Sequence, residues 1–160
     1  MKKLLLLATL STMSFSATAG ELGNCEPFAL VGNISHHFGN NDKYRNEHPS
    51  AGGGCEFDGG EFVYSTQGIY TKNSYDRDSL FVTGNANYIA YEDKTIRASI
   101  GLTGGFATGY EPIKASKGGF IPILGANAEI CRTSVCLYAL ALPNYSDADG
   151  VVTGGFKYKF

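Results

Sequence analysis

The sequence has no tryptophan, only three histidines and little charge, because 18% of its 160 residues are Asp, Glu, Lys or Arg. After Gly20 it also lacks any run close to the ~18 apolar residues that a transmembrane helix needs, which excludes a helical membrane protein. Its 13 Lys and Arg residues are outnumbered by 15 Asp and Glu residues. Nucleic-acid-binding proteins normally present a basic face, so this mild acidity argues against a nucleic-acid partner.

What the sequence does contain indicates an exported, folded domain. Hydrophobic residues make up 43% of the chain and aromatic residues 12%, far more than in disordered proteins. Residues 1–19 have the pattern of a secretory signal, with a basic start, an apolar segment from Leu4 to Leu10 and the small residues Ala17 to Ala19 at the cleavage site. We therefore expect residues 20–160 to form one domain outside the cytoplasm.

The mature part alternates with a period of two, which is typical of β-strands. The last ten residues show this most clearly, because Lys157 and Lys159 fall on one face and an apolar set falls on the other. That set is Val152, Gly154, Phe156, Tyr158 and Phe160. Such a strand suits a position with lipid on one side and a polar interior on the other.

The same alternation recurs in about eight segments of roughly ten residues, the number and length of the smallest outer-membrane barrels. The predicted strands are 27–38, 50–57, 62–73, 79–91, 95–107, 119–131, 135–143 and 151–160. We therefore predict an all-β protein, an eight-stranded antiparallel transmembrane barrel of the Gram-negative outer membrane. Without tryptophan, Tyr and Phe must form its interfacial belts.

The predicted connections alternate in length. Those at 58–61, 92–94 and 132–134 are short, and those at 39–49, 74–78, 108–118 and 144–150 are mostly longer. This is the pattern of periplasmic turns and external loops, and an even number of strands places both chain ends in the periplasm. A barrel of this size holds side chains or one slender ligand, so it is not a porin. We expect a monomer whose partners are membrane lipids, with no cofactor.

All four cysteines map to the periplasmic rim of this barrel. Cys25 precedes the first strand, Cys55 ends the second, and Cys131 and Cys136 flank the third short turn. Of the three possible pairings, this layout favours Cys25–Cys55 and Cys131–Cys136 in an oxidising compartment. A metal site is the alternative, which the lack of a nearby histidine or C-x-x-C spacing disfavours.

Two polar segments map to the external end. In the first strand we assign Phe28, Leu30 and Ile34 to the lipid face, which places His37 inside the barrel with Asn33 and Ser35 and points His36 outward. Ser74 follows the third strand at the same rim.

A histidine beside a serine is the minimum for acyl transfer, because the imidazole takes the hydroxyl proton as the oxygen attacks a carbonyl. Asn73 and Glu47 are candidates to orient the ring or stabilise its charge. The alternative is structural, since a histidine in a barrel lumen is more often a hydrogen-bonded filler. Geometry discriminates between the two: a His37–Ser74 separation well beyond ~8 Å would favour a binding protein.

The stretches Tyr44–Gly54 and Lys72–Tyr75 resemble stretches of the lipid A palmitoyltransferase (PagP-like) family of outer-membrane enzymes. That family reads Tyr-Asn-Glu-Arg-Pro-Trp-Gly-Gly-Gly in the first and Lys-Asp-Ser-Trp in the second. The similarity is collinear from about His37 to Phe160. The resemblance implies transfer of an acyl chain from a phospholipid to lipid A, with an interior pocket that measures chain length.

Residue by residue, the resemblance places the family's catalytic histidine on His37, with His36 as second choice, and its serine on Ser74. Its aspartate is replaced by Asn73, which cannot stabilise an imidazolium by charge, so we expect a weaker, altered or absent activity unless Glu47 substitutes. The prolines Pro49, Pro122 and Pro143 also resemble the family's. Proline weakens strand pairing, and the resemblance implies that lipid enters the barrel there.

The interior supports two interpretations. Gly101, Thr103, Gly105 and Gly125 keep parts of the lumen small and able to admit an acyl chain, whereas Arg97, Glu129 and Lys157 would form a charged plug such as any small barrel needs. Two alternative functions therefore stay open. One is a non-enzymatic barrel used for adhesion, receptor masking or envelope stabilisation, and the other is a lipid A esterase with the same site residues.

Overall fold

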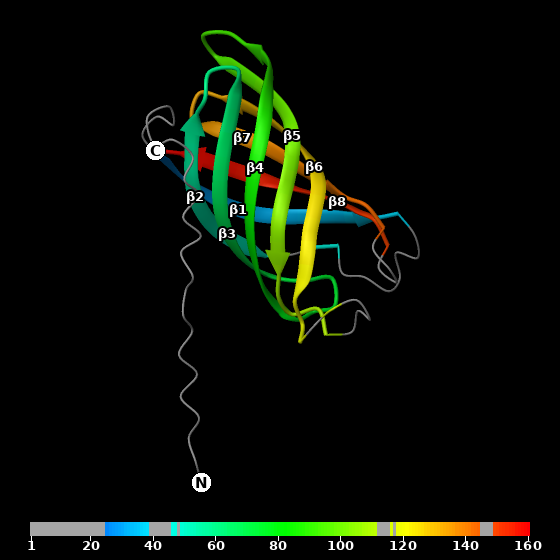
Figure 1. Cartoon of the computed structure of the whole chain (residues 1–160). Coiled ribbons are helices and arrows are strands. Elements are labelled where there is room, and N and C mark those ends of the chain that lie inside the picture. Colours follow the sequence, from blue (N-terminus) through cyan, green and yellow to red (C-terminus); the bar gives the residue numbers. More distant parts are fainter. Residues whose placement is uncertain (1–24, 39–45, 48, 112–115, 117, 145–148) are drawn as a thin grey trace, which may run out of the picture.

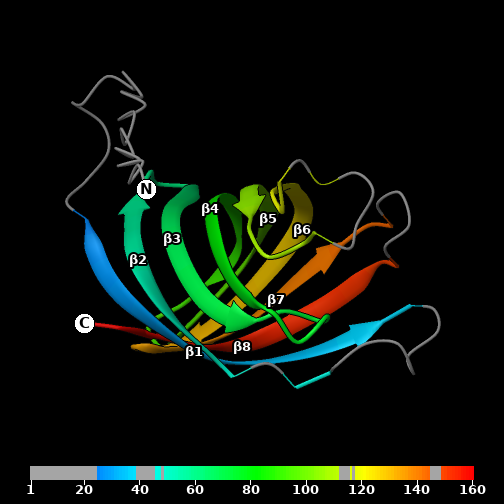
Figure 2. The ribbon, with the colours of Figure 1, turned by 90° about the horizontal axis from the view of Figure 1, so that it is seen from below.

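The computed structural model describes residues 25–38, 46–47, 49–111, 116, 118–144 and 149–160, which form one closed barrel of eight antiparallel strands. Each strand pairs with the next along the chain, and β8 pairs with β1 to close the barrel (Figures 1 and 2). The strands are β1 (Glu26–His37), β2 (Ser50–Asp58), β3 (Phe62–Lys72), β4 (Asp78–Glu92), β5 (Ile96–Ala107), β6 (Ile121–Arg132), β7 (Val135–Leu142) and β8 (Val151–Lys159).

The predicted fold is confirmed, and every strand boundary lies within two residues of the predicted one. Of the residues described, none belongs to a helix long and apolar enough to cross a membrane. The predicted signal at 1–19 lies outside the described residues, as do positions 20–24.

The predicted alternation of connections is confirmed as well. Short turns join β2 to β3, β4 to β5 and β6 to β7, at the end of the barrel that also carries Cys25 and the C-terminus, here called the turn end (Figure 1). The other connections lie at the opposite, loop end. In the β4–β5 turn the backbone N–H groups of Thr95 and Ile96 donate to the Asp93 carboxylate at 2.7 and 2.8 Å, which holds its pKa well below the usual value.

The outer surface of the barrel is apolar and carries two belts of Tyr and Phe, as expected for a chain without tryptophan. Exposed aromatic side chains near the loop end are Phe38, Tyr70, Phe106 and Phe120, and those toward the turn end are Phe62, Tyr64, Tyr88, Tyr91, Phe156, Tyr158 and Phe160. The surface between them is aliphatic and includes Val82, Ile100, Leu102, Leu124 and Leu137. This distribution matches a barrel wall that faces hydrocarbon between two interfaces.

A β-bulge in β1 corrects one prediction. Gly32 has a φ of 74°, in the left-handed region that glycine tolerates, and the pairing of β1 with β8 shifts register between Val31 and Ile34. The extra residue reverses the alternation across the bulge. Phe28 and Leu30, predicted to face lipid, are therefore inside the barrel with exposed fractions of 3% and 2%, whereas Ile34 faces outward as predicted.

Both predicted disulfides are confirmed. Cys25 is bonded to Cys55, and Cys131 is bonded to Cys136, which stands directly opposite it in the β6–β7 ladder. Both bonds lie at the turn end. Because all four sulfur atoms are bonded in pairs, none is a thiolate ligand, and the alternative of a cysteine metal site is wrong.

A charged plug fills the turn end of the lumen. Lys157 Nζ donates to Glu56 Oε2 at 2.7 Å and to Glu129 Oε2 at 2.6 Å, while Lys159 and Arg97 also pair with Glu56. The predicted plug residues Arg97, Glu129 and Lys157 are thus confirmed, and Glu56, which the sequence analysis missed, is the carboxylate that Arg97, Lys157 and Lys159 share. Pairing on this scale is what allows charges to stay buried.

Candidate functional site

The predicted histidine and serine meet at the loop end of the lumen. His37 is the last residue of β1, where it pairs with Val151 of β8, and its side chain is 4% exposed. Ser74 lies in the turn that follows β3, and its Oγ is 2.9 Å from His37 Nε2. In the tautomer protonated at Nδ1, Nε2 accepts a hydrogen bond from the Ser74 hydroxyl. The geometric prediction is confirmed, and the catalytic role of the pair stays a prediction.

The orientation of the neighbouring β1 residues agrees with the prediction in this half of the strand. Ser35 is buried, like His37, and His36 is exposed, with its ring edge against Phe38 at 5.9 Å between centroids. The side chain of Asn33 lies outside the described part. His37 is therefore the histidine with access to Ser74, in preference to His36.

Asn73 and Glu47 are placed differently from one another. Asn73 is 2% exposed, and its amide bonds within the loops: Nδ2 donates to Gly109 O at 2.7 Å, and Oδ1 accepts from the backbone N–H groups of Tyr75 and Arg77. Glu47 is exposed and forms an antiparallel bridge with Ile34 of β1. The suggested support of the imidazole by either residue stays a prediction. The Asn73 amide, however, forms hydrogen bonds within its own turn and to the facing connection.

A cavity of about 100 Å³ lies beside Ser74, inside the barrel. Its wall between the mouth and the middle of the barrel is largely apolar, with Leu30, Ile69, Phe81, Leu140, Leu142 and Val151 beside the polar side chains of Ser35, Gln67, Thr71 and Thr153. The order of residues along β3 shows the layering, because Thr71 lies near the mouth, Ile69 follows and Ser65 lies deeper. Tyr110 closes one side of the mouth, and burial raises the pKa of its phenol, with a smaller contribution from Tyr75.

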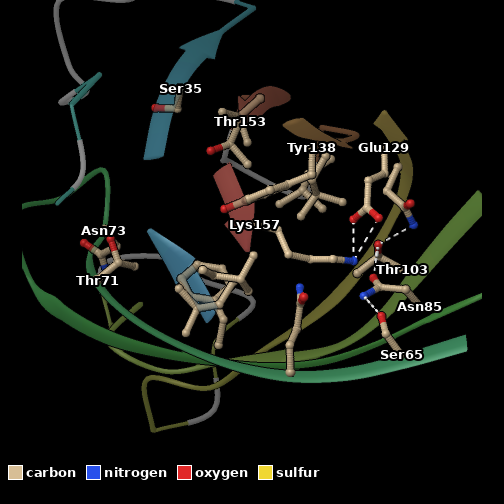
Figure 3. Close-up of a pocket in the computed structure, with 18 of the residues that line it drawn as sticks. Ser35, Ser65, Thr71, Asn73, Asn85, Thr103, Glu129, Tyr138, Thr153 and Lys157 are labelled. Carbon is tan, nitrogen blue, oxygen red and sulfur yellow. Dashed lines mark hydrogen bonds and ion pairs between the residues drawn. The ribbon is translucent and has the colours of Figure 1, made fainter. Parts of the chain in front are cut away.

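The floor of the cavity is polar. Asn85 donates to Ser65 Oγ at 2.8 Å, Thr103 donates to Asn85 Oδ1 at 2.6 Å and Asn127 donates to Thr103 Oγ1 at 2.9 Å. Figure 3 shows this chain of hydrogen bonds beside Lys157, which reaches from β8 toward Glu129. Below its mouth the lumen therefore changes from a largely apolar wall to a polar floor, and then to charged residues at the turn end.

Several lumenal residues were missed by the sequence analysis. Glu56 is buried in the lumen, on the same face of β2 as Ser50, from which it is six residues away. Strict alternation along the strand would have predicted this direction. Phe28, whose ring centroid lies 4.6 Å from Lys157 Nζ, was assigned to the lipid face because the bulge in β1 was not predicted. Tyr110 lies in a connection, where no periodicity predicts the direction of a side chain.

Comparison with known proteins identifies the fold. No protein-family model and no curated protein matches the chain. A solved structure described as "De novo design of transmembrane beta-barrels" superposes on 87% of this chain and 99% of its own, with a TM-score of 0.52 and 13% identity. The chain has the fold of a small transmembrane β-barrel.

A second solved structure, the solution NMR structure of the de novo designed barrel TMB2.3, agrees. It covers 86% of this chain and 96% of its own, with a TM-score of 0.51 and 9% identity. At such identities the likeness concerns the transmembrane barrel fold alone. Function has to be argued from the pair of His37 and Ser74 and from the cavity beside it.

Proposed function

We propose that this protein is an outer-membrane acyltransferase that moves a fatty acyl chain from a phospholipid to lipid A. The observation that carries the proposal is the 2.9 Å contact between Ser74 Oγ and His37 Nε2 at the mouth of a cavity with a largely apolar upper wall. The contact lies within the range expected of a nucleophile and its base. The sequence resemblance to lipid A palmitoyltransferases at Lys72–Tyr75 supports the same reaction.

In the proposed reaction the acyl chain of the donor lies along the apolar wall with its ester carbonyl at Ser74. His37 Nε2 takes the hydroxyl proton as Oγ attacks the carbonyl, and then gives that proton to the departing lysophospholipid oxygen. An acceptor hydroxyl of lipid A next attacks the acyl-serine ester. His37 takes the acceptor's proton and returns it to Ser74, so the enzyme ends in its starting state.

Lipid access through the barrel wall is supported by two interruptions of strand pairing near the loop end. The β6–β7 ladder ends at Ala126–Ala141, although β6 continues outward to Ile121 along β5. The regular β1–β2 ladder ends at Val31–Ala51, and pairing with β1 resumes at the isolated bridge between Ile34 and Glu47. Pro49, Pro122 and Pro143 flank these places, and proline cannot donate to a ladder. We propose that lipid chains enter the cavity laterally here.

The outer-membrane location is supported by the apolar outer wall with its Tyr and Phe belts and by the secretory pattern of residues 1–19. The two disulfides at the turn end fit a periplasm that permits disulfide bonds. With the turn end in the periplasm, Ser74 and His37 lie at the outer leaflet, where lipid A is found.

Expression of the full chain in a Gram-negative host tests the proposal. Wild-type protein is expected to raise the mass of part of the lipid A by one acyl group, as measured by mass spectrometry. Ser74→Ala should give a folded barrel and unmodified lipid A. Loss of an acyl group would instead indicate an esterase, and unchanged lipid A with folded wild-type barrel in the outer membrane would refute the transferase.

A further inference from the structure

We infer that Asn73 is a positioning residue, whose amide fixes Ser74 against His37 by locking the β3–β4 connection onto the β5–β6 connection. Only the kinetic part of its test depends on the acyl transfer proposed above. It also gives a reason why an amide, rather than a carboxylate, stands before the serine in this chain.

The first part of the argument is the Ser74 turn, defined as residues 73–77. Asn73 closes it at four points: its backbone N–H donates to Arg77 O at 2.8 Å, its carbonyl accepts from Asp76 N at 2.9 Å, and its Oδ1 accepts from Tyr75 N at 3.0 Å and Arg77 N at 3.1 Å. A side-chain oxygen that accepts these backbone N–H groups holds a turn closed. Ser74 lies within the closed turn, so its position depends on Asn73.

The second part is the contact with the facing connection. Asn73 Nδ2 donates to Gly109 O at 2.7 Å, and two further contacts follow in parallel. The rings of Tyr75 and Tyr110 meet edge to face at 6.1 Å, and Arg77 pairs with Glu111 at 2.9 Å. Of these three contacts, the Arg77–Glu111 pair is exposed and therefore weak, whereas the Asn73 bond joins a buried side chain to a half-buried carbonyl and is less exposed to water.

Gly109 presents its carbonyl in a conformation that only glycine adopts easily. Its φ is 83°, and an added Cβ would stand 2.4 Å from the carbonyl oxygen of Asp78. Gly109 therefore approaches the start of β4 so closely that there is no room for a side chain.

The chemistry of this position requires an amide. Asn73 uses Oδ1 as an acceptor and Nδ2 as a donor at the same time, and a carboxylate offers acceptors only. In an Asn73→Asp variant a charged oxygen would face the Gly109 carbonyl oxygen across a buried gap. We expect the turn to move away from the β5–β6 connection and to carry Ser74 Oγ away from His37.

The test combines a spectroscopic and a kinetic measurement on the full barrel in lipid nanodiscs. The ¹⁵N resonance of His37 Nε2, assigned with His37→Gln, reports the hydrogen bond from Ser74. In Asn73→Asp it should move to the position found in Ser74→Ala. Misplacement of a reacting group by about 1 Å costs on the order of 10²-fold, so kcat for acyl transfer should fall about that much with little change in KM.

Two further variants keep the inference falsifiable if Asn73→Asp does not fold. Asn73→Ser retains a hydroxyl that can close the turn but cannot reach Gly109, and Gly109→Ala disturbs the same bond from the other side. Both should shift the Nε2 resonance. The matched control is Asp93→Ala, which removes a turn-capping side chain at the opposite end of the barrel and should leave the resonance unchanged.

Two results would overturn the inference: a wild-type Nε2 resonance in Asn73→Asp, or acyl transfer at least as fast as wild type. Faster transfer would instead assign position 73 to charge stabilisation of the imidazolium. If the wild-type protein transfers no acyl group at all, the proposed function fails. The Nε2 resonance then still decides the role of Asn73.

Discussion

Replacing His37 with alanine is expected to reduce acyl transfer by on the order of 10⁴-fold, because the variant loses the base that takes the proton of Ser74. The barrel itself should remain folded, since His37 ends β1 and its backbone pairing with Val151 is unaffected. Rates are measured on purified protein in phospholipid vesicles with lipid A as acceptor, and folding is checked by the different gel mobility of heated and unheated barrel.

His36→Ala is the matched control for this prediction. The two histidines are neighbours on one strand, but His36 is exposed and His37 is buried beside Ser74. His36→Ala should therefore keep most of the wild-type rate. Equal losses in both variants, or full activity in His37→Ala, would show that the contact between His37 and Ser74 does not carry the reaction.

Replacing Lys157 with methionine is expected to cause the largest loss of stability, about 3–5 kcal/mol in the free energy of unfolding. Lys157 and Glu56 have side chains only 5% and 3% exposed, and Glu129 is paired with the same ammonium group. The variant leaves these carboxylates with too little positive charge in a space with little access to water. Urea unfolding of the barrel in lipid vesicles measures the change.

A double variant and a surface variant serve as controls for this prediction. Lys157→Met/Glu129→Gln removes the carboxylate left without a cation, while Glu56 keeps Lys159 and Arg97, so much of the lost stability should return. Lys94→Met, at an exposed position in the β4–β5 turn, should change stability little. An equal effect of Lys94→Met and Lys157→Met would contradict the account of the plug.

Much of the barrel could be predicted from sequence because its two faces meet different environments. In β4, for example, Val82, Ala86 and Tyr88 face outward while Thr83 and Asn87 are buried, as the alternation of the sequence predicts. In a membrane the backbone hydrogen bonds must be formed within a closed sheet, so each alternating segment has to be a strand of the barrel. The number of strands and the lengths of the turns could therefore be read from the same pattern. The disulfide pairing could be predicted as well, because this topology places all four cysteines at the turn end.

Apart from Glu56, which lies on a regularly alternating strand, the errors and omissions arise where the period of two is broken. The bulge at Gly32 adds a residue to β1 and reverses the faces of Phe28 and Leu30 without any change in composition. The roles of Asn73 and Gly109 depend on a hydrogen bond between two residues that are 36 positions apart and lie in different connections, which no local sequence pattern predicts. The meeting of His37 with Ser74 was predictable, since both lie at ends of strands that must reach the same rim.

The most direct test of the central claim is transfer by the purified protein from a phospholipid with an isotope-labelled acyl chain, with lipid A as acceptor. The account predicts that wild-type protein moves the label to lipid A, that lysophospholipid appears in equal amount, and that Ser74→Ala moves none. Label released as free fatty acid, or label that stays in the phospholipid while the barrel is folded, would contradict it.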